Sequence, residues 1–212
     1  MATISEGVEK KGGNRRLILL ALAALAAGVL LGWVVLGWLR PYTYHGLEVH
    51  ANTPVTNFTL IGPGGQPVSL VDFRGQIVLL YFGYTFCPDV CPATMSELKK
   101  AMVELGKQGE DVQVIMVSLD PERDTPEKLA EYMAYFHPSF IGLTGSEDEI
   151  VAASAPLGIF YERHEGTASS GYLVDHTATV MVLDRNGRLR LVIPFDTAGE
   201  DIAADLRHLL RE

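Results

Sequence analysis

Residues 77–92 read IVLLYFGYTFCPDVCP and contain both cysteines of the 212-residue chain, Cys87 and Cys91. The first half, Ile77 to Gly83, is a continuous apolar run, which is typical of a strand buried on both faces. We expect a helix from about Pro92, because proline is tolerated in the first helical turn. Cys87 to Cys91 would then form a tight turn between strand and helix, where helix-terminal N–H groups lower a thiol pKa.

Further strands and helices alternate after this stretch, and a short hairpin of residues 57–60 and 66–70 precedes it. The expected strands are Val112 to Leu119, Phe140 to Leu143, Thr177 to Leu183 and Arg188 to Ile193, and the expected helices run from Thr125 to about Phe136, from Ser146 to about Ala155 and from Gly199 to Arg211. Strands separated by helices indicate a parallel centre, and the terminal Asn-Gly hairpin adds an antiparallel edge. The sequence therefore predicts an α/β, thioredoxin-like domain over residues 57–212, with a central mixed sheet and an N-terminal hairpin.

A 23-residue stretch without charge, Leu17 to Leu39, lies near the N-terminus. As a helix it is about 35 Å long, enough to span a hydrocarbon core of roughly 30 Å. A cleaved signal peptide is the alternative, but its apolar region is usually only about 7–15 residues long. We therefore expect a cytoplasmic N-terminus (1–16), a single transmembrane anchor (17–39) and a tether (40–56).

Charge sets the expected orientation and limits the partners. Four basic residues precede the apolar stretch and one closely follows it, in the order Lys10, Lys11, Arg15, Arg16 and Arg40. The positive-inside tendency therefore places the folded domain outside the cytoplasm. No Arg/Ser-rich leader precedes the stretch, which favours a bacterial cytoplasmic (inner) membrane, with the domain on the periplasmic side, over a mitochondrial one. The chain has a net charge of −9, and −12 once the first 40 residues are set aside, which argues against nucleic acid as a partner.

Two sulfurs in a C-x-x-x-C spacing have two possible uses. They can close into a disulfide, which an extracytoplasmic location permits, although so small a loop would not hold a domain together. They can also share a soft metal ion, and a Cys2His set suits copper, whereas structural zinc would need a fourth ligand, and none is apparent near the cysteines. Of six histidines, His176 is the candidate third ligand, because it directly precedes an expected core strand in a loop that faces the active site of thioredoxin-like folds. The others are expected to be solvated or, at a helix end, to compensate the helix dipole: His45, His50, His137, His164 and His208.

Three motifs in order resemble the signatures of the Sco/SenC proteins: Gly83 to Pro92, Asp120 to Pro126 and Val174 to His176. The likeness covers about Phe58 to the C-terminus and the single N-terminal anchor. It implies a copper chaperone that helps to build the binuclear copper centre of cytochrome c oxidase subunit II. It also implies Cys87, Cys91 and His176 as ligands of Cu(I) or Cu(II), and other copper chaperones or thioredoxin-like reductants as candidate further partners. Family members often carry histidine where this chain has Phe86, a departure that bears on partner docking or redox tuning and leaves the three ligands intact.

Three other functions compete with copper delivery. A thiol–disulfide oxidoreductase would use Cys87 and Cys91 as a redox pair to reduce the acceptor's cysteines before metallation, and both roles can hold in one protein. A peroxidase would need threonine where Tyr84 stands. An electron-transfer site of the binuclear copper type would need histidine and methionine where Met95 and Leu98 stand, and therefore fails.

Acidic and basic residues near the sulfurs allow two interpretations. Asp124 or Thr125 is expected to cap the helix that follows. Alternatively, Asp120 or Arg123 shapes the surface beside the copper loop. Asp89, between the sulfurs, either accepts a hydrogen bond, discourages anions or is a solvated turn residue.

Overall fold

The computed structural model describes residues 13–38, 41–166 and 171–212. Two compact units are present, Met1–Thr43 and Tyr44–Glu212. In the first, α1 (Gly13–Trp38) contains the stretch Asn14–Gly37, which is long and apolar enough to cross a membrane. Of the predicted cytoplasmic segment 1–16, residues 1–12 lie outside the described residues, and Asn14 to Arg16 belong to α1.

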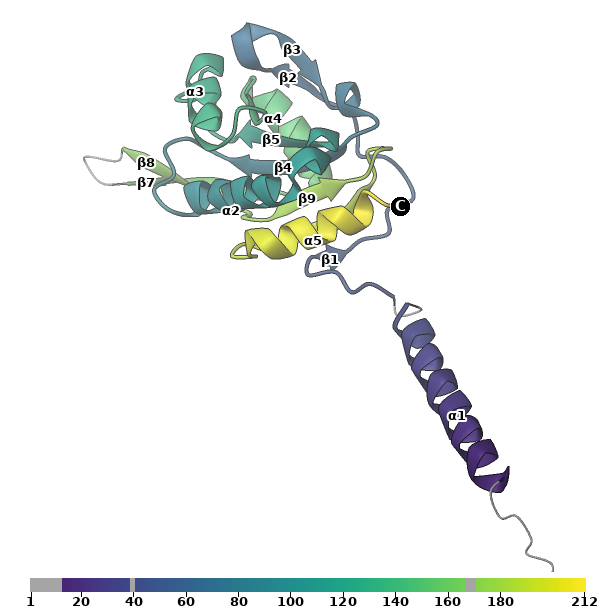
Figure 1. The fold of residues 1–212 in the computed structure, drawn as a ribbon. Helices are drawn as coiled ribbons and strands as arrows, with labels where there is room; N and C mark the ends of the chain where they lie inside the picture. The colour runs from purple at the N-terminus through teal and green to yellow at the C-terminus, as the bar shows by residue number, and fades with distance from the viewer. Residues whose placement is uncertain (1–12, 39–40, 167–170) are drawn as a thin grey trace, which may run out of the picture. The chain divides into compact units, whose positions relative to one another are not determined.

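The second unit is an α/β domain (Figure 1). Its strands are β1 (Leu47–Glu48), β2 (Thr59–Ile61), β3 (Pro67–Ser69), β4 (Ile77–Gly83), β5 (Val112–Ser118), β6 (Ile141–Leu143), β7 (Tyr161–Glu165), β8 (Tyr172–His176), β9 (Val180–Leu183) and β10 (Leu189–Ile193). Its helices are α2 (Val90–Leu105), α3 (Pro126–Phe136), α4 (Glu147–Ser154) and α5 (Gly199–Leu209). The predicted N-terminal hairpin is confirmed as β2–β3.

The central sheet has the strand order β1-β10-β9-β4-β5-β6. β4, β5 and β6 are parallel, while β9 and β10 form an antiparallel hairpin that pairs with β4 through β9. The predicted mixed sheet is therefore confirmed. Its outer edge differs from the prediction, because β1 pairs with β10 and so covers the terminal hairpin. This strand comes from residues 40–56, which we expected to be a tether.

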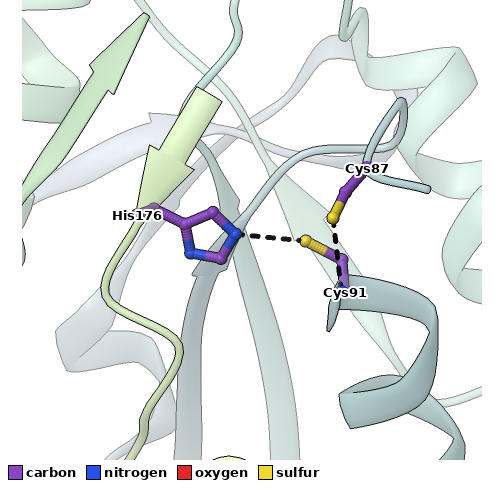
Figure 2. A group of neighbouring side chains, drawn as sticks. All are labelled: Cys87, Cys91 and His176. Atoms are coloured by element: carbon purple, nitrogen blue, oxygen red, sulfur yellow. Dashed lines mark hydrogen bonds between the residues drawn. The ribbon is translucent and has the colours of Figure 1, made fainter. Parts of the chain in front are cut away.

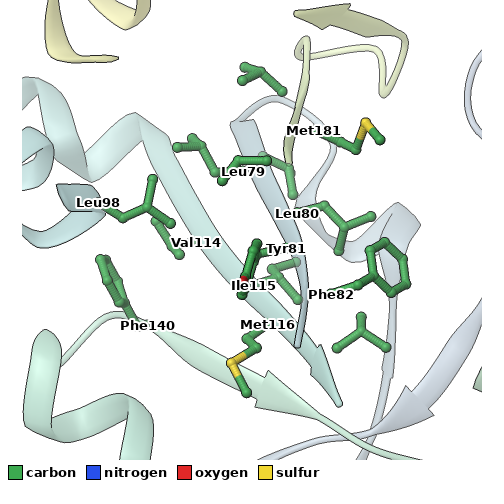
Figure 3. Close-up of a cluster of buried hydrophobic side chains, with 14 of the residues drawn as sticks. Leu79, Leu80, Tyr81, Phe82, Leu98, Val114, Ile115, Met116, Phe140 and Met181 are labelled. Atoms are coloured by element: carbon green, nitrogen blue, oxygen red, sulfur yellow. The ribbon is translucent and has the colours of Figure 1, made fainter. Parts of the chain in front are cut away.

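The core lies on both faces of β4. All seven residues of this strand are buried, which explains why its sequence is apolar throughout rather than alternating. Figure 3 shows Leu79, Tyr81 and their neighbours packed with side chains from β5 and α2, among them Ile115 and Leu98. α2 and α5 lie side by side (Figure 1). Burial of this kind fixes the carboxyl end of β4, from which the cysteine loop departs.

Two boundaries near the cysteines differ from the prediction. α2 begins at Val90 and not at Pro92, so Cys91 is in the first helical turn. A proline at the third helical position costs no hydrogen bond, because the first four N–H groups of a helix have no partner within it. β9 begins at Val180 and not at Thr177, and His176 is the last residue of β8. The hairpin of β7 and β8 was not predicted; it forms a separate two-stranded sheet.

Candidate metal centre

Three side chains from three different elements meet at one end of the domain (Figure 2). Cys87 lies in the loop after β4, Cys91 in the first turn of α2 and His176 at the end of β8. One donor atom from each lies within 4.8 Å of the others. Both cysteines are free thiols. The structure thus brings together the three residues that sequence analysis selected, although 85 residues separate Cys91 from His176.

Close packing at the end of β4 makes this arrangement possible. Gly83 has no side chain, and a Cβ atom there would stand 2.7 Å from Cε1 of Tyr81 and 2.9 Å from Sγ of Cys91. Both distances are too short for real contacts. Glycine at this position therefore allows the start of α2 to approach the end of β4, which brings the Cys91 sulfur below the loop.

The two thiols have opposite acidities. A hydrogen bond with Cys91 lowers the pKa of Cys87 to about 3, and hydrogen bonds with His176 and with the backbone N–H groups of Asp89 and Cys91 act in the same direction. The hydrogen bond with Cys87, together with burial, raises the pKa of Cys91. Cys87 is half-buried and Cys91 is fully buried. At neutral pH, Cys87 is consequently a thiolate near the surface, and Cys91 is a protonated thiol beneath it.

A backbone hydrogen bond orients the His176 ring. Its Nδ1 lies 3.1 Å from the backbone carbonyl of Thr177, which can only accept, so Nδ1 carries the proton. Its Nε2 lies 3.4 Å from Sγ of Cys91, so this nitrogen faces the two sulfurs. A backbone carbonyl on the far nitrogen is a common way to orient a metal-binding histidine. The ring is therefore prepared to donate Nε2 to an ion.

Two tyrosines of β4 and its loop enclose the imidazole. The rings of Tyr81 and Tyr84 meet the His176 ring edge-on, with centroids 5.9 and 6.1 Å away. The Tyr81 hydroxyl also donates to Sγ of Cys91 at 3.5 Å. One side of the group remains open, because Cys87 and His176 line a surface cavity of about 290 Å³. An ion or a partner's sulfur could reach the donors from this side.

The donor set within the described residues has three members, with no fourth His, Cys, Asp or Glu in the group. Two sulfurs and one imidazole nitrogen suit a soft ion in low coordination better than a closed four-ligand zinc site. The three donors equally permit disulfide chemistry, which requires the sulfurs and access to one thiolate.

Of the polar residues near the sulfurs, one caps a helix and another hydrogen-bonds the cysteine loop to the end of β5. Thr125 caps α3, accepting a hydrogen bond from the backbone N–H of Lys128, as one of the two predicted alternatives states. Asp124, fully buried, instead accepts from the Thr85 N–H at 2.9 Å, from the Thr85 hydroxyl at 2.5 Å and from the Ser118 hydroxyl at 2.7 Å. Sequence analysis missed this brace between the cysteine loop and the end of β5. Asp89 precedes α2 and makes no side-chain capping bond to it.

The remaining histidines stand apart from this group. His45 is exposed, as predicted, but its Nδ1 also lies 2.9 Å from the buried carboxylate of Asp205. His137 ends α3 and contacts the Ser139 hydroxyl, and His164 pairs with Asp175. The pattern of the sequence gave no sign of the His45 contact, which joins residues 160 positions apart.

Comparisons with known proteins agree with this geometry. The family model described as SCO1/SenC matches residues 48–211. The SCO2-like protein of Rickettsia felis is 34% identical over 152 residues, which cover 71% of this chain and 74% of the relative. The apo Sco1 protein of Thermus thermophilus is 46% identical with a TM-score of 0.72, over 79% of this chain and 98% of its own. Bradyrhizobium japonicum ScoI, solved with copper bound, is 33% identical with a TM-score of 0.68, over 74% of this chain and 99% of its own.

Proposed function

Because the chain belongs to the SCO1/SenC family, we propose that it binds a copper ion through Cys87, Cys91 and His176. The resemblance expected from its three sequence motifs is thereby confirmed at the level of the family. The observation that carries the proposal is the convergence of two sulfurs and one imidazole nitrogen within 4.8 Å, in a group that is open on one side. A relative, Bradyrhizobium japonicum ScoI, was solved with copper bound, which supports the choice of ion.

The unequal acidities of the thiols suggest an order of binding. Cys87 is already a thiolate and half-buried, so it meets an incoming ion first. Cys91 gives up its proton as the ion reaches it, since a metal displaces the proton of a coordinating thiol. His176 supplies Nε2, the ring nitrogen that faces the sulfurs, as the third ligand. Transfer proceeds in reverse, by exchange of Cys87 for a sulfur of the acceptor on the open side.

The proposal also covers the acceptor of the copper ion and the membrane in which the protein lies. The resemblance implies delivery to the binuclear copper centre of cytochrome c oxidase subunit II. The helix α1 would hold the chain in a bacterial inner membrane, with Tyr44–Glu212 on the periplasmic side, in agreement with the basic residues that precede the apolar stretch.

A second function, thiol–disulfide exchange, is favoured by the same asymmetry of the thiols. The Cys87 thiolate would attack a disulfide of the acceptor and form a mixed disulfide, releasing one acceptor thiolate. Cys91, on losing its proton, would then attack the Cys87 sulfur and release the second acceptor thiol. The acceptor ends reduced and the Cys87–Cys91 pair ends oxidised, which removes both sulfurs from copper binding.

Copper affinity separates the two functions. In His176→Ala, loss of the nitrogen donor should weaken Cu(I) binding by at least about tenfold, while the control His50→Ala, altered at an exposed side chain, should bind as the unchanged protein does. The measurement is Cu(I) competition against a chromophoric chelator, on full-length reduced protein in detergent. Equal copper affinity in His176→Ala and the unchanged protein would remove the three-donor site. If the protein exchanges disulfides but binds no stoichiometric copper, only the redox function remains.

A further inference from the structure

The strand that carries His176 is not part of the central sheet. β8 pairs with β7 alone among the described strands, and these two form their own antiparallel ribbon. Cys87 and Cys91, in contrast, follow directly from β4 at the centre of the six-stranded sheet. Isolated two-stranded ribbons are marginally stable by themselves. Besides the three-residue link from His176 to β9, side-chain contacts that attach β8 to the rest of the domain therefore set the distance between the imidazole and the sulfurs.

One such attachment holds the first residue of β8, Tyr172. Its hydroxyl donates to Oδ1 of Asp120 at 2.5 Å, and its backbone carbonyl accepts from a guanidinium nitrogen of Arg123 at 3.0 Å. The guanidinium carbon of Arg123 lies 3.7 Å from the centroid of the Tyr172 ring. Tyr172 is thus held at its ring, its hydroxyl and its carbonyl by two residues of the connection between β5 and α3.

The holding residues are themselves fixed. Asp120 is fully buried one residue beyond Leu119, and its backbone N–H donates to the Ser118 hydroxyl at the end of β5. Arg123 forms a hydrogen-bonded ion pair with the other oxygen of Asp120. A planar guanidinium can stack on a ring and donate in its own plane at the same time, which an ammonium group cannot do. The contact to Tyr172 therefore starts from a rigid part of the core.

Geometry of the strand carries this attachment to the imidazole. Tyr172, Val174 and His176 are alternate residues of one strand and so share a face. Val174 is held as well, because its N–H donates to the Tyr84 hydroxyl at 3.2 Å. A shift of Tyr172 would therefore be transmitted along this short strand and displace His176 at its other end.

The same guanidinium also touches the cysteine loop. Its carbon lies 4.7 Å from the centroid of the Phe86 ring, and Phe86 directly precedes Cys87. Arg123 thus contacts both segments whose separation defines the donor group. We propose that Arg123, fixed by Asp120, is a positioning residue that sets the distance of His176 from the two sulfurs; this rests on the proposed copper site. Arg123 is not itself a ligand.

The test is a comparison of single and double variants in the full-length protein, with Cu(I) affinity measured by chelator competition. Arg123→Lys keeps the charge but loses the stacked, in-plane donation, and should weaken copper binding by about tenfold, within the range for residues that orient a ligand. Arg123→Lys combined with His176→Ala should bind copper no more weakly than His176→Ala alone, because there is then no imidazole to position. Arg207→Lys, a control at an arginine paired with Glu104, should leave the affinity unchanged.

A second variant and a second measurement distinguish a loss of positioning from a folding defect. Tyr172→Phe removes the bond to Asp120 but keeps the ring, and should weaken copper binding in the same direction by a smaller factor. In the Cu(II) form, nitrogen hyperfine splitting in the electron paramagnetic resonance spectrum should diminish in Arg123→Lys, which a loss of general stability alone would not cause.

Three results would overturn the inference, and they are distinguishable from failure of the copper site. If His176→Ala weakens binding while Arg123→Lys and Tyr172→Phe bind as the unchanged protein does, the copper site stands and the positioning role falls. If the losses from Arg123→Lys and His176→Ala multiply in the double variant, Arg123 acts independently of His176. If His176→Ala itself binds copper normally, the proposed site and the inference fall together.

Discussion

Cys87 and Cys91 are identical side chains four residues apart, yet their surroundings give them different chemistry. The hydrogen bond with the Cys91 side chain contributes most to the lowered pKa of Cys87, and the backbone N–H of Cys91, 3.5 Å from the Cys87 sulfur, adds to it. Cys91 itself lies in the core beside the Tyr81 hydroxyl. The first residue of a helix and the loop before it are where amide groups converge on such an anion. Hydrogen bonds and burial, rather than residue type, therefore make one sulfur reactive.

This difference predicts an unusual pH profile of alkylation. Because the pKa of Cys87 is lowered to about 3, its thiolate is fully formed throughout the neutral range. Its reaction rate with iodoacetamide should therefore be nearly constant from about pH 5 to about pH 8, whereas an ordinary thiol reacts about tenfold faster per pH unit below its pKa.

Mass spectrometry of peptides from the reduced, copper-free protein would measure the rate at each cysteine. Cys91 should remain unmodified until the protein unfolds, because burial and the hydrogen bond with Cys87 raise its pKa. A Cys87 rate that climbs tenfold per unit between about pH 6 and about pH 8, as for a free thiol, would contradict the assignment.

At the scale of residues, the sequence predicts the three ligand side chains but not the side chains that hold them in place. Cys87, Cys91 and His176 could be selected because soft-metal chemistry restricts the residue types and the fold restricts where they stand. The stacking of Arg123 on Phe86 and Tyr172 could not be selected, because it joins three segments through side-chain geometry that no spacing encodes. The segment Asp120 to Pro126 had two interpretations, helix capping and shaping of the surface beside the copper loop. Thr125 does cap α3, and the contacts of Arg123 place it beside the loop as well.

At the scale of elements, Asp124 ties the cysteine loop to the end of β5. Its buried carboxylate accepts three hydrogen bonds, two from Thr85 and one from Ser118. Asp124→Asn would turn an NH₂ group toward one of these donors, and an unsatisfied buried group costs about 1–3 kcal/mol. We expect a loss of that size in the free energy of unfolding, measured by urea denaturation.

A matched control distinguishes this brace from a general effect of charge. Asp111 is exposed and pairs loosely with Arg185 at 3.7 Å, so Asp111→Asn should change the stability by no more than about 0.5 kcal/mol. Equal effects of the two substitutions would show that Asp124 does not brace the loop.

Prediction of the elements succeeded where burial dominates the sequence. β4 matches its predicted bounds and β5 ends one residue early, because both are continuous apolar runs. The hairpin of β7 and β8 escaped prediction because the side chains of β7, YERHE, are almost all exposed and show no apolar period. A strand that pairs outside the main sheet leaves little hydrophobic signal, although here it delivers His176.

At the scale of the whole molecule, the segment that follows the first unit is fastened to the last helix. Asp205 of α5 is buried and accepts hydrogen bonds from the backbone N–H groups of His45 and Gly46 and from the His45 ring. Residues 40–56, expected as a tether, therefore include a part that belongs to the folded unit. Contact between the two ends of the domain could not be predicted from either end alone.

The His45 contact predicts a pH dependence of stability. The hydrogen bond with Asp205 raises the pKa of His45 in the folded state above its ordinary value of 6.5. The stabilisation by the charged ring is therefore complete below that value and is lost as the pH rises through the raised folded-state pKa. His45 is partly exposed, so the effect should be about 0.2–1 kcal/mol.

His45→Gln keeps a hydrogen-bonding group but does not titrate. The difference in unfolding free energy between the unchanged protein and this variant should be larger at about pH 5 than at about pH 8, as measured by urea denaturation. His50→Gln, altered at an exposed ring, should show no such trend. A difference that grows with rising pH would refute the assigned contact.

The copper site itself is tested most directly by X-ray absorption spectroscopy of the Cu(I)-loaded full-length protein. The structure predicts two sulfur ligands and one nitrogen ligand for each ion, and two sulfurs without the nitrogen in His176→Ala. A first shell without nitrogen in the unchanged protein, or one that is identical in the two proteins, would contradict a site made by Cys87, Cys91 and His176.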